Sequence, residues 1–145
     1  MPTLLITGAN RGIGLELTRQ YAADGWQVHA CCRSPEAATE LLDLSAQSGE
    51  LIHVHALDVC NDQQRTALAQ QLSGQPIDIL FNNAGMYGDW DYQSFGSSNA
   101  AEWDKVFRTN VIAPMQMMEH FADNVAASEQ KLIANMSSKM GSMQD

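Results

Sequence analysis

Basic residues are scarce in this chain. Its 145 residues include 8 Lys and Arg against 17 Asp and Glu, which gives a formal net charge of −9 at pH 7. Non-specific binding to nucleic acid or to an anionic membrane depends on clustered Lys and Arg. The composition therefore argues against both kinds of partner, and any site for an anion must be local.

Long apolar runs are also missing. No stretch approaches the roughly 20 apolar residues that span a bilayer, and no charged-then-apolar leader is visible. We therefore expect a cytoplasmic protein that is not inserted in a membrane. The hydrophobic content of 45% is ordinary for a globular protein, and the length predicts one domain over residues 1–145.

Cysteine and histidine are too few and too scattered to indicate metal or disulfide chemistry. Cys31, Cys32 and Cys60 lack CxxC spacing, and the first two are expected to alternate across a strand as small buried groups. His53 and His55 would share one face of a strand, but no third ligand is in view. We expect structural thiols and no metal site.

Apolar segments alternate with helix-like segments along the chain. Strands are expected at residues 3–6, 27–32, 51–56, 78–81 and 131–136, and helices at residues 12–23, 35–44, 62–72 and 100–127. Strands separated by helices imply βαβ units with right-handed crossovers. The prediction is an α/β fold, a Rossmann-type doubly wound parallel sheet with five strands in the order 3-2-1-4-5 and ligands at the carboxyl ends of the strands.

A glycine-rich segment, TGANRGIG from Thr7 to Gly14, lies between the first expected strand and the first expected helix. Glycine can take the positive φ of a tight turn, and it has no Cβ to keep a phosphate away from backbone N–H groups. Gly8 suits the turn, Gly12 suits the close approach, and Gly14 lets the helix pack tightly on the strand. Because the helix would direct its positive end at the phosphates, the segment predicts a cradle for a dinucleotide.

Five motifs, in this order along the whole chain, resemble the short-chain dehydrogenase/reductase family. They are TGANRGIG, the pair Asp58 and Val59, NNAG from Asn82 to Gly85, Asn110 in RTNVIAP, and Ser138 in NMSSKMG. The wording SSKMGSM is also similar to the C-factor-type or carbonyl-reductase-type branch. The resemblance implies an oxidoreductase that transfers hydride between a nicotinamide cofactor and a small-molecule carbonyl or alcohol substrate, in a homo-oligomer.

The resemblance also implies a set of contacts to the cofactor. They involve Gly8, Asn10, Arg11, Gly12, Ile13 and Gly14 in the glycine loop, Arg33 after the second strand, Asp58 and Val59 beside the adenine, and Asn82, Asn83, Ala84 and Gly85 after the fourth strand. Asp58 could also cap the helix that follows it, for which Asn61 and Asp62 are further candidates.

Charge indicates which form of the cofactor is bound. An acidic residue about 20 positions past the glycine loop would accept the ribose hydroxyls of NAD and repel a 2′-phosphate. The chain instead has Cys31, Cys32 and Arg33 there. A guanidinium can meet a phosphate with two hydrogen bonds, and Arg11 with Arg33 resembles the paired basic positions of NADP-preferring members. NADP (NADPH) is the expected cofactor, and the alternative is two solvated surface arginines.

The family's catalytic residues are only partly present. The resemblance assigns the serine that orients the carbonyl to Ser138, which precedes Gly141 by three positions, and leaves Ser137 as the alternative. It assigns the asparagine of a proton relay to Asn110, which could instead bond backbone near Pro114. The proton-donating Tyr-x-x-x-Lys occurs nowhere in the chain. We therefore expect the amino-terminal portion of a longer reductase, with a sheet incomplete at the C-terminus and no activity alone. A non-enzymatic NADP-binding sensor or interaction protein is the alternative.

The longest expected loop, residues 86–99, is rich in aromatic side chains. It carries Tyr87, Trp90, Tyr92 and Phe95. These rings could line a substrate pocket, or they could anchor the loop by packing it onto the domain. The sequence leaves both interpretations open.

Overall fold

One five-stranded parallel sheet organises the protein, for which the computed structural model describes residues 1–143 apart from the side chain of Met140. The strands are β1 (Thr3–Ile6), β2 (Gln27–Cys32), β3 (Ile52–Ala56), β4 (Ile79–Asn82) and β5 (Leu132–Asn135). They pair in the order β3-β2-β1-β4-β5, so the predicted doubly wound topology is confirmed. The topological switch point lies between β1 and β4: β2 and β3 are added on one side of β1, and β4 and β5 on the other.

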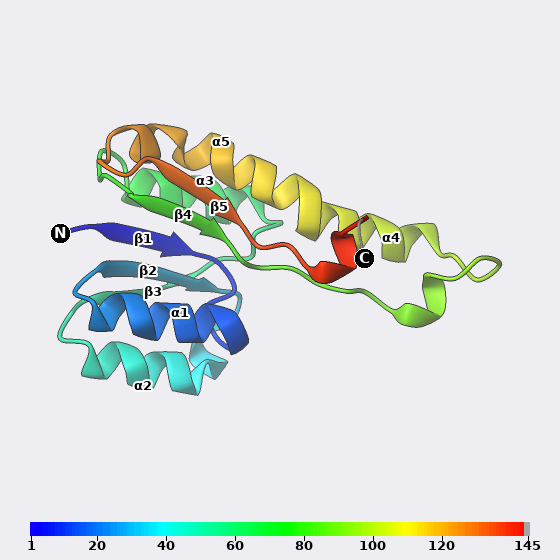
Figure 1. Cartoon of the computed structure of the whole chain (residues 1–145), viewed down its shortest axis with the longest axis horizontal. Helices are drawn as coiled ribbons and strands as arrows, with labels where there is room; N and C mark the ends of the chain where they lie inside the picture. Colours follow the sequence, from blue (N-terminus) through cyan, green and yellow to red (C-terminus); the bar gives the residue numbers. More distant parts are fainter. Residues whose placement is uncertain (144–145) are drawn as a thin grey trace.

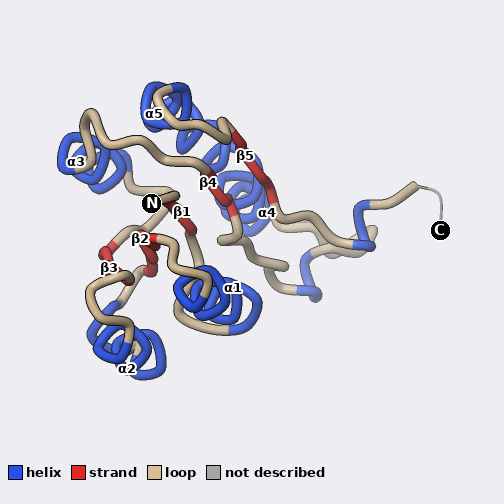
Figure 2. The backbone as a smooth tube through the Cα atoms, turned by 60° about the vertical axis from the view of Figure 1, so that its left-hand side comes forward, coloured by secondary structure: helices blue, strands red, loops and turns tan. Residues whose placement is uncertain are grey.

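Helices cover both faces of this sheet (Figures 1 and 2). α1 (Gly12–Ala23) and α2 (Thr39–Gln47) lie on one face, and α3 (Asp62–Gln71) and α5 (Ala113–Ala126) lie on the other. Because successive strand residues point to opposite faces, Cys31 and Cys32 enter different cores, as the sequence predicted. Cys31 packs with Met117 and Phe121 of α5, whereas Cys32 belongs to the core that includes Leu41 of α2.

Two predicted helices differ from the structure. Residues 35–44 were expected to be one helix, but Pro35–Ala37 forms a 3-10 turn and α2 begins at Thr39. Residues 100–127 were expected to be one regular helix, but α4 (Ala100–Phe107) and α5 are joined by a five-residue π-helix, Arg108–Ile112. There the N–H of Ala113 bonds the carbonyl of Arg108, five residues back. Pro114, which follows, has no N–H to continue the regular ladder.

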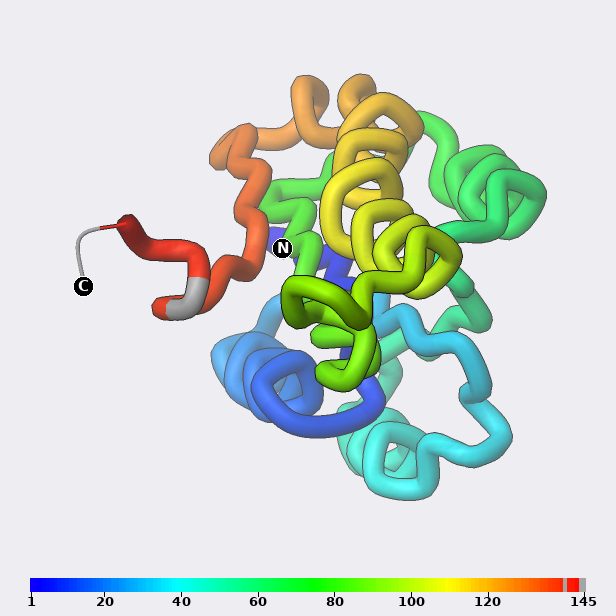
Figure 3. The backbone as a smooth tube through the Cα atoms, turned by 90° about the vertical axis from the view of Figure 1, so that its right-hand side faces the viewer, coloured from blue at the N-terminus to red at the C-terminus, as the bar shows by residue number. Residues whose placement is uncertain are grey.

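α4 and the loop before it extend past the carboxyl ends of the strands (Figures 1 and 3). The loop contains a 3-10 turn, Trp90–Tyr92, and Phe95 in this loop is fully exposed. The sequence analysis suggested that the aromatic rings of this loop could anchor it by packing onto the domain. For Phe95 that interpretation is wrong, because its ring is exposed. Within residues 1–143, no helix combines the length and apolar character needed to cross a bilayer.

Three histidines form a cluster at the β2–β3 side of the sheet. His29 of β2 lies opposite His53 of β3, and their rings stack with centroids 5.4 Å apart. Nδ1 of His29 is 2.9 Å from Nε2 of His55, so His53 and His55 do share one face. His29 is only 6% exposed, and burial, helped by the two neighbouring imidazoles, lowers its pKa to about 4.

This cluster predicts a loss of stability in mild acid. The unfolded chain protonates His29 near its ordinary pKa of 6.5, whereas the folded protein keeps it neutral down to about pH 4. Stability is therefore full above pH 6.5 and falls as the pH drops from 6.5 to 4, by on the order of 3 kcal/mol from this residue. Urea unfolding at several pH values in this window should show a shallower decline for His29→Leu than for the parent. Parallel pH curves for the two proteins would contradict the assignment.

Candidate active site

The glycine loop has the backbone that a phosphate cradle needs. Gly8 and Gly12 have φ of +63° and +55°, which side chains of L-residues rarely adopt. A Cβ on Gly14 would collide with the carbonyl oxygen of Gly8, so the third glycine is required for close packing of helix on strand. A Cβ on Gly12 would meet no described atom within 4 Å. The side of the loop at Gly12 is therefore open, as close approach of a phosphate requires.

Thr7, which the sequence analysis did not select, joins the glycine loop to the NNAG segment. Its hydroxyl accepts hydrogen bonds from the N–H groups of Asn83 at 3.0 Å and Ala84 at 2.9 Å. The Asn83 side chain returns two bonds, from Nδ2 to the carbonyls of Thr7 at 3.1 Å and Gly8 at 3.2 Å. Thr7 is 1% exposed, so these bonds are formed away from water. The two predicted cofactor segments are thus one hydrogen-bonded unit.

The N-terminus of α1 carries no side-chain cap. Arg11 occupies the cap position in extended backbone, without a hydrogen bond from its side chain to the helix. Ile13 in the first turn is 60% exposed, and Asn10 is exposed as well. The first N–H groups of a helix need acceptors, and its positive end attracts an anion. An uncapped, accessible helix start beside an open glycine loop fits a dinucleotide phosphate.

Arg11 and Arg33 provide the positive charge near this loop. The N–H of Ala9 donates to the carbonyl of Cys31 at 3.0 Å, which holds the glycine loop against the end of β2, two residues before Arg33. Both arginines are exposed, and neither has an ion pair with a residue in the range 1–143. Their guanidinium groups are therefore available to a ligand at the end of β2.

Asp58 forms a turn at the end of β3 and does not cap α3. Its Oδ1 accepts from the N–H of Cys60 at 2.9 Å, and its own N–H donates to Oε1 of Gln64 at 2.6 Å. Asn61 caps α3 instead, because its side chain accepts from the N–H of Gln64 at 3.0 Å. The capping role considered for Asp58 is therefore wrong, while Asn61 as a cap is confirmed.

A buried arginine, also absent from the sequence analysis, fixes the next residue. Arg65 is 1% exposed, and its Nη1 donates to the carbonyl of Val59 at 2.5 Å while Nη2 pairs with Asp62 at 3.1 Å. The Val59 side chain lies in the core beneath α3. Val59 is consequently held from both its side chain and its carbonyl.

Asn110 lies in the π-helix and bonds the loop that leaves NNAG. Its Oδ1 accepts from the N–H of Met86 at 2.9 Å, and its Nδ2 donates to the carbonyl of Met86 at 2.7 Å. A Cβ on Gly85 would lie 3.3 Å from Oδ1 of Asn110, so this glycine permits the contact. The alternative role near Pro114 belongs to Asn82, whose Nδ2 donates to Pro114 O at 3.4 Å and to Oδ1 of Asn135 at 2.8 Å.

Ser137 and Ser138 follow β5 at the same edge of the sheet. The N–H of Met136 donates to the carbonyl of Asn82 at 2.9 Å, which holds the start of this segment beside β4. Both serines are exposed and precede a 3-10 turn, Lys139–Gly141. The Ser138 carbonyl accepts from the N–H of Gly141, while a Cβ on Gly141 would lie 3.6 Å from Oγ of Ser137. Both hydroxyls thus remain candidates for the catalytic role.

Comparison with known proteins agrees with this arrangement. The family model for short chain dehydrogenases matches residues 2–145, nearly the whole chain. The chain belongs to the short-chain dehydrogenase family. An uncharacterized oxidoreductase of Schizosaccharomyces pombe is 33% identical over 141 residues, which cover 95% of this chain and 54% of that protein. The chain therefore spans about half the length of this relative.

Solved structures of short-chain dehydrogenases share the fold. A carbonyl reductase from Pseudomonas aeruginosa PAO1 is 32% identical, with a TM-score of 0.91, and the match covers 99% of this chain and 64% of that one. An NADPH-bound carbonyl reductase from chicken fatty liver is 30% identical, with a TM-score of 0.88 and coverage of 100% and 62%. These matches confirm the family and the resemblance to carbonyl reductases. The roles of single residues stay predictions.

The Thr7 hydroxyl can be tested for the role that the hydrogen bonds give it. Thr7→Val keeps the shape but leaves the N–H groups of Asn83 and Ala84 without their acceptor, which should cost about 1–3 kcal/mol. Thr7→Ser keeps the hydroxyl and should cost about 1 kcal/mol or less. Urea unfolding of the three proteins provides the comparison, with unchanged m values as the control. Equal losses for the two variants would show that the methyl group, not the hydroxyl, stabilises this junction.

Proposed function

We propose that these residues bind NADPH and form the cofactor half of an oxidoreductase acting on a carbonyl or alcohol. The observation that carries the proposal is the open glycine loop at the uncapped start of α1, near the guanidinium groups of Arg11 and Arg33, which form no ion pair within residues 1–143. An anion with two separate phosphate groups suits this combination. The NADPH-bound chicken carbonyl reductase supports the same choice by similarity.

Each predicted residue has a role in this proposal. NADPH would supply the hydride. The N–H groups at Gly12 and Ile13 would bind the pyrophosphate, and Arg11 with Arg33 would bind the 2′-phosphate. Asp58 uses Oδ1 for its own turn, which leaves Oδ2 as an acceptor for the adenine amino group.

The polar residues at the other strand ends would act on the substrate side. Ser138 would orient the carbonyl by donating its hydroxyl hydrogen. Asn110 has both polar atoms of its side-chain amide bonded to Met86, so its side chain holds the loop after NNAG in place. The amide keeps a second N–H and a second lone pair on Oδ1, through which it would hold the relay water. The proton donor must come from a Tyr-x-x-x-Lys segment, which is absent from these 145 residues.

Assembly and location are further parts of the proposal. Three exposed apolar side chains follow one another along the end of α4, the π-helix and α5 at intervals of four residues: Phe107, Val111 and Met115. Such a stripe favours a homo-oligomer, because large exposed apolar patches usually mark an interface. The free thiols of Cys31, Cys32 and Cys60 fit a reducing, cytoplasmic location.

Cofactor choice can be tested on the 145-residue protein. We expect tighter binding of NADPH than of NADH, and Arg33→Asp should weaken NADPH binding about ten-fold or more, because a charge-assisted contact to phosphate is lost. Fluorescence titrations with both cofactors measure this effect. Arg19→Asp, which changes the net charge equally on the outer face of α1, is the matched control and should leave the preference intact. Equal affinities for the two cofactors in the parent protein would refute the choice of NADPH.

Turnover should require a protein that also contains the Tyr-x-x-x-Lys segment, so NADPH oxidation by the 145 residues alone should be undetectable with aldehydes and ketones.

In a longer protein, Ser138→Ala should remove most turnover while NADPH binding persists, and Ser137→Ala should be milder. Asn110→Ala should lower kcat more than it raises KM. The reverse order for the serines would reassign the catalytic hydroxyl to Ser137. NADPH binding without turnover in the longer protein would favour the sensor alternative.

A further inference from the structure

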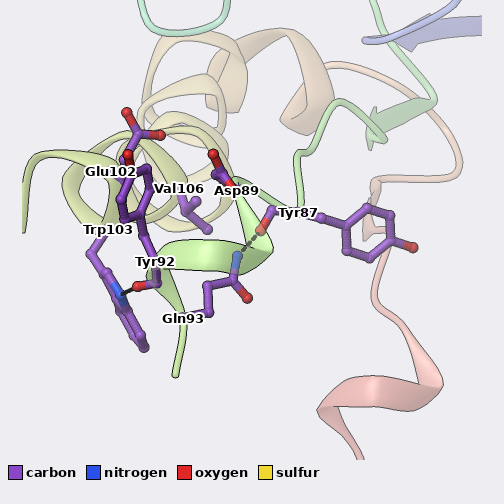
Figure 4. Close-up of a pocket in the computed structure, with 7 residues that line it drawn as sticks. All are labelled: Tyr87, Asp89, Tyr92, Gln93, Glu102, Trp103 and Val106. Atoms are coloured by element: carbon purple, nitrogen blue, oxygen red, sulfur yellow. Dashed lines mark hydrogen bonds between the residues drawn. The ribbon is translucent and has the colours of Figure 1, made fainter. Parts of the chain in front are cut away.

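A pocket that none of the predicted site residues lines lies between the 86–99 loop and α4 (Figure 4). Its volume is about 90 Å³, and it is open to solvent. The seven lining residues are Tyr87, Asp89, Tyr92, Gln93, Glu102, Trp103 and Val106. Pockets for drug-sized ligands have volumes of about 300–1,000 Å³, so this space suits one small chemical group and not a dinucleotide.

Several specific contacts hold the walls of this pocket in place. Gly88 has φ of +75°, and a Cβ there would lie 2.5 Å from Cγ2 of Val106, so only glycine lets the loop approach α4 this closely. Nε1 of Trp103 donates to the carbonyl of Tyr92 at 2.8 Å. Gln93 donates from Nε2 to the carbonyl of Tyr87. The pocket is therefore formed by the fold itself and needs no ligand to create it.

The lining combines aromatic and acidic side chains. Tyr92 and Trp103 supply rings, while Asp89 and Glu102 supply two carboxylates, and no basic residue lines the space. The ring of Tyr87 points away from the other lining residues (Figure 4). Lys105 pairs with Oε1 of Glu102 at 3.0 Å, which leaves Oε2 available.

These groups together favour a positively charged ligand. The face of an aromatic ring attracts cations, and tryptophan does so most strongly. Asp89 adds Coulomb attraction in a pocket whose remaining walls are largely apolar, and Glu102 adds to it through Oε2 with a charge that Lys105 partly balances. A phosphate or a carboxylate would meet like charge here, so the pocket has the opposite preference from the glycine loop. We propose that it binds a small organic ammonium ion.

The position of the pocket separates it from the cofactor cradle but connects it to Asn110. The loop enters the pocket at Tyr87, directly after Met86, whose backbone makes both hydrogen bonds to the Asn110 side chain. The binding proposal rests on the pocket residues alone. It holds whether or not the chain binds NADPH, and the experiment on it succeeds or fails independently.

Tetramethylammonium is the probe, titrated into the 145-residue protein while NMR follows the indole N–H of Trp103. The variant Trp103→Phe assigns that resonance. We expect a saturable shift with a dissociation constant on the order of 1–10 mM, and binding of tert-butanol, a neutral molecule of similar shape, about five-fold weaker or worse. Sodium chloride at equal ionic strength should give no saturable shift.

Charge variants decide the chemistry of recognition. Glu102→Gln and Asp89→Asn each remove a charge while keeping the shape of the side chain, so each should weaken binding about five-fold. The amide introduced by Asp89→Asn would keep an oxygen that accepts from the N–H of Asp91, so the turn that follows should persist. Glu119→Gln on α5 is the matched control outside the pocket and should change nothing. Val106→Phe, which fills the space, should abolish binding without unfolding the protein, as thermal melting can verify. Equal binding of tert-butanol, or unchanged affinity in both charge variants, would overturn the proposal.

Discussion

The junction between β1 and β4 is the interaction on which the site depends. Two parallel strands end side by side there, and the hydroxyl of Thr7 accepts the N–H groups of Asn83 and Ala84 that no further ladder would satisfy. The Asn83 amide then holds the carbonyls of the glycine loop. Since buried polar groups without partners are costly, these bonds stabilise the inner side of the loop, while its side at Gly12 stays open.

The sequence predicted the parts that follow from local chemistry. Strand and helix alternation, with glycines at the first turn, was enough for the sheet order and for the position of the tight glycine turn after β1. Glycine at positions 8, 12 and 14 has a backbone reason that follows from residue type and spacing alone. Asn61 as a cap likewise follows from residue type and position. The glycine turn and the cap depend on neighbours within a few residues, whereas the sheet order follows from the general preference for right-handed crossovers.

Other features depend on partners far along the chain and were missed. The π-helix coincides with the side chain of Asn110 reaching Met86, 24 residues away, and no local pattern gives that pairing. Arg65 looks like a surface residue of a polar helix, yet it is buried because it satisfies the carbonyl of Val59. The side chain that donates to the carbonyl of Pro114 belongs to Asn82, not to Asn110. Which side chain reaches this carbonyl depends on the order of the strands in the sheet. Long-range geometry decided each of these cases.

Charge is distributed so that two opposite preferences can exist in one small protein. With a net charge of −9, the chain as a whole repels anions, so a phosphate site needs the local field of a helix start and two arginines at the β1 and β2 ends. In the pocket between the 86–99 loop and α4, Asp89 and Glu102 are acidic, like most charged residues of the chain. The two hydrogen bonds between Asn110 and Met86 join the start of the acidic loop to the π-helix, directly after Gly85 of the NNAG segment.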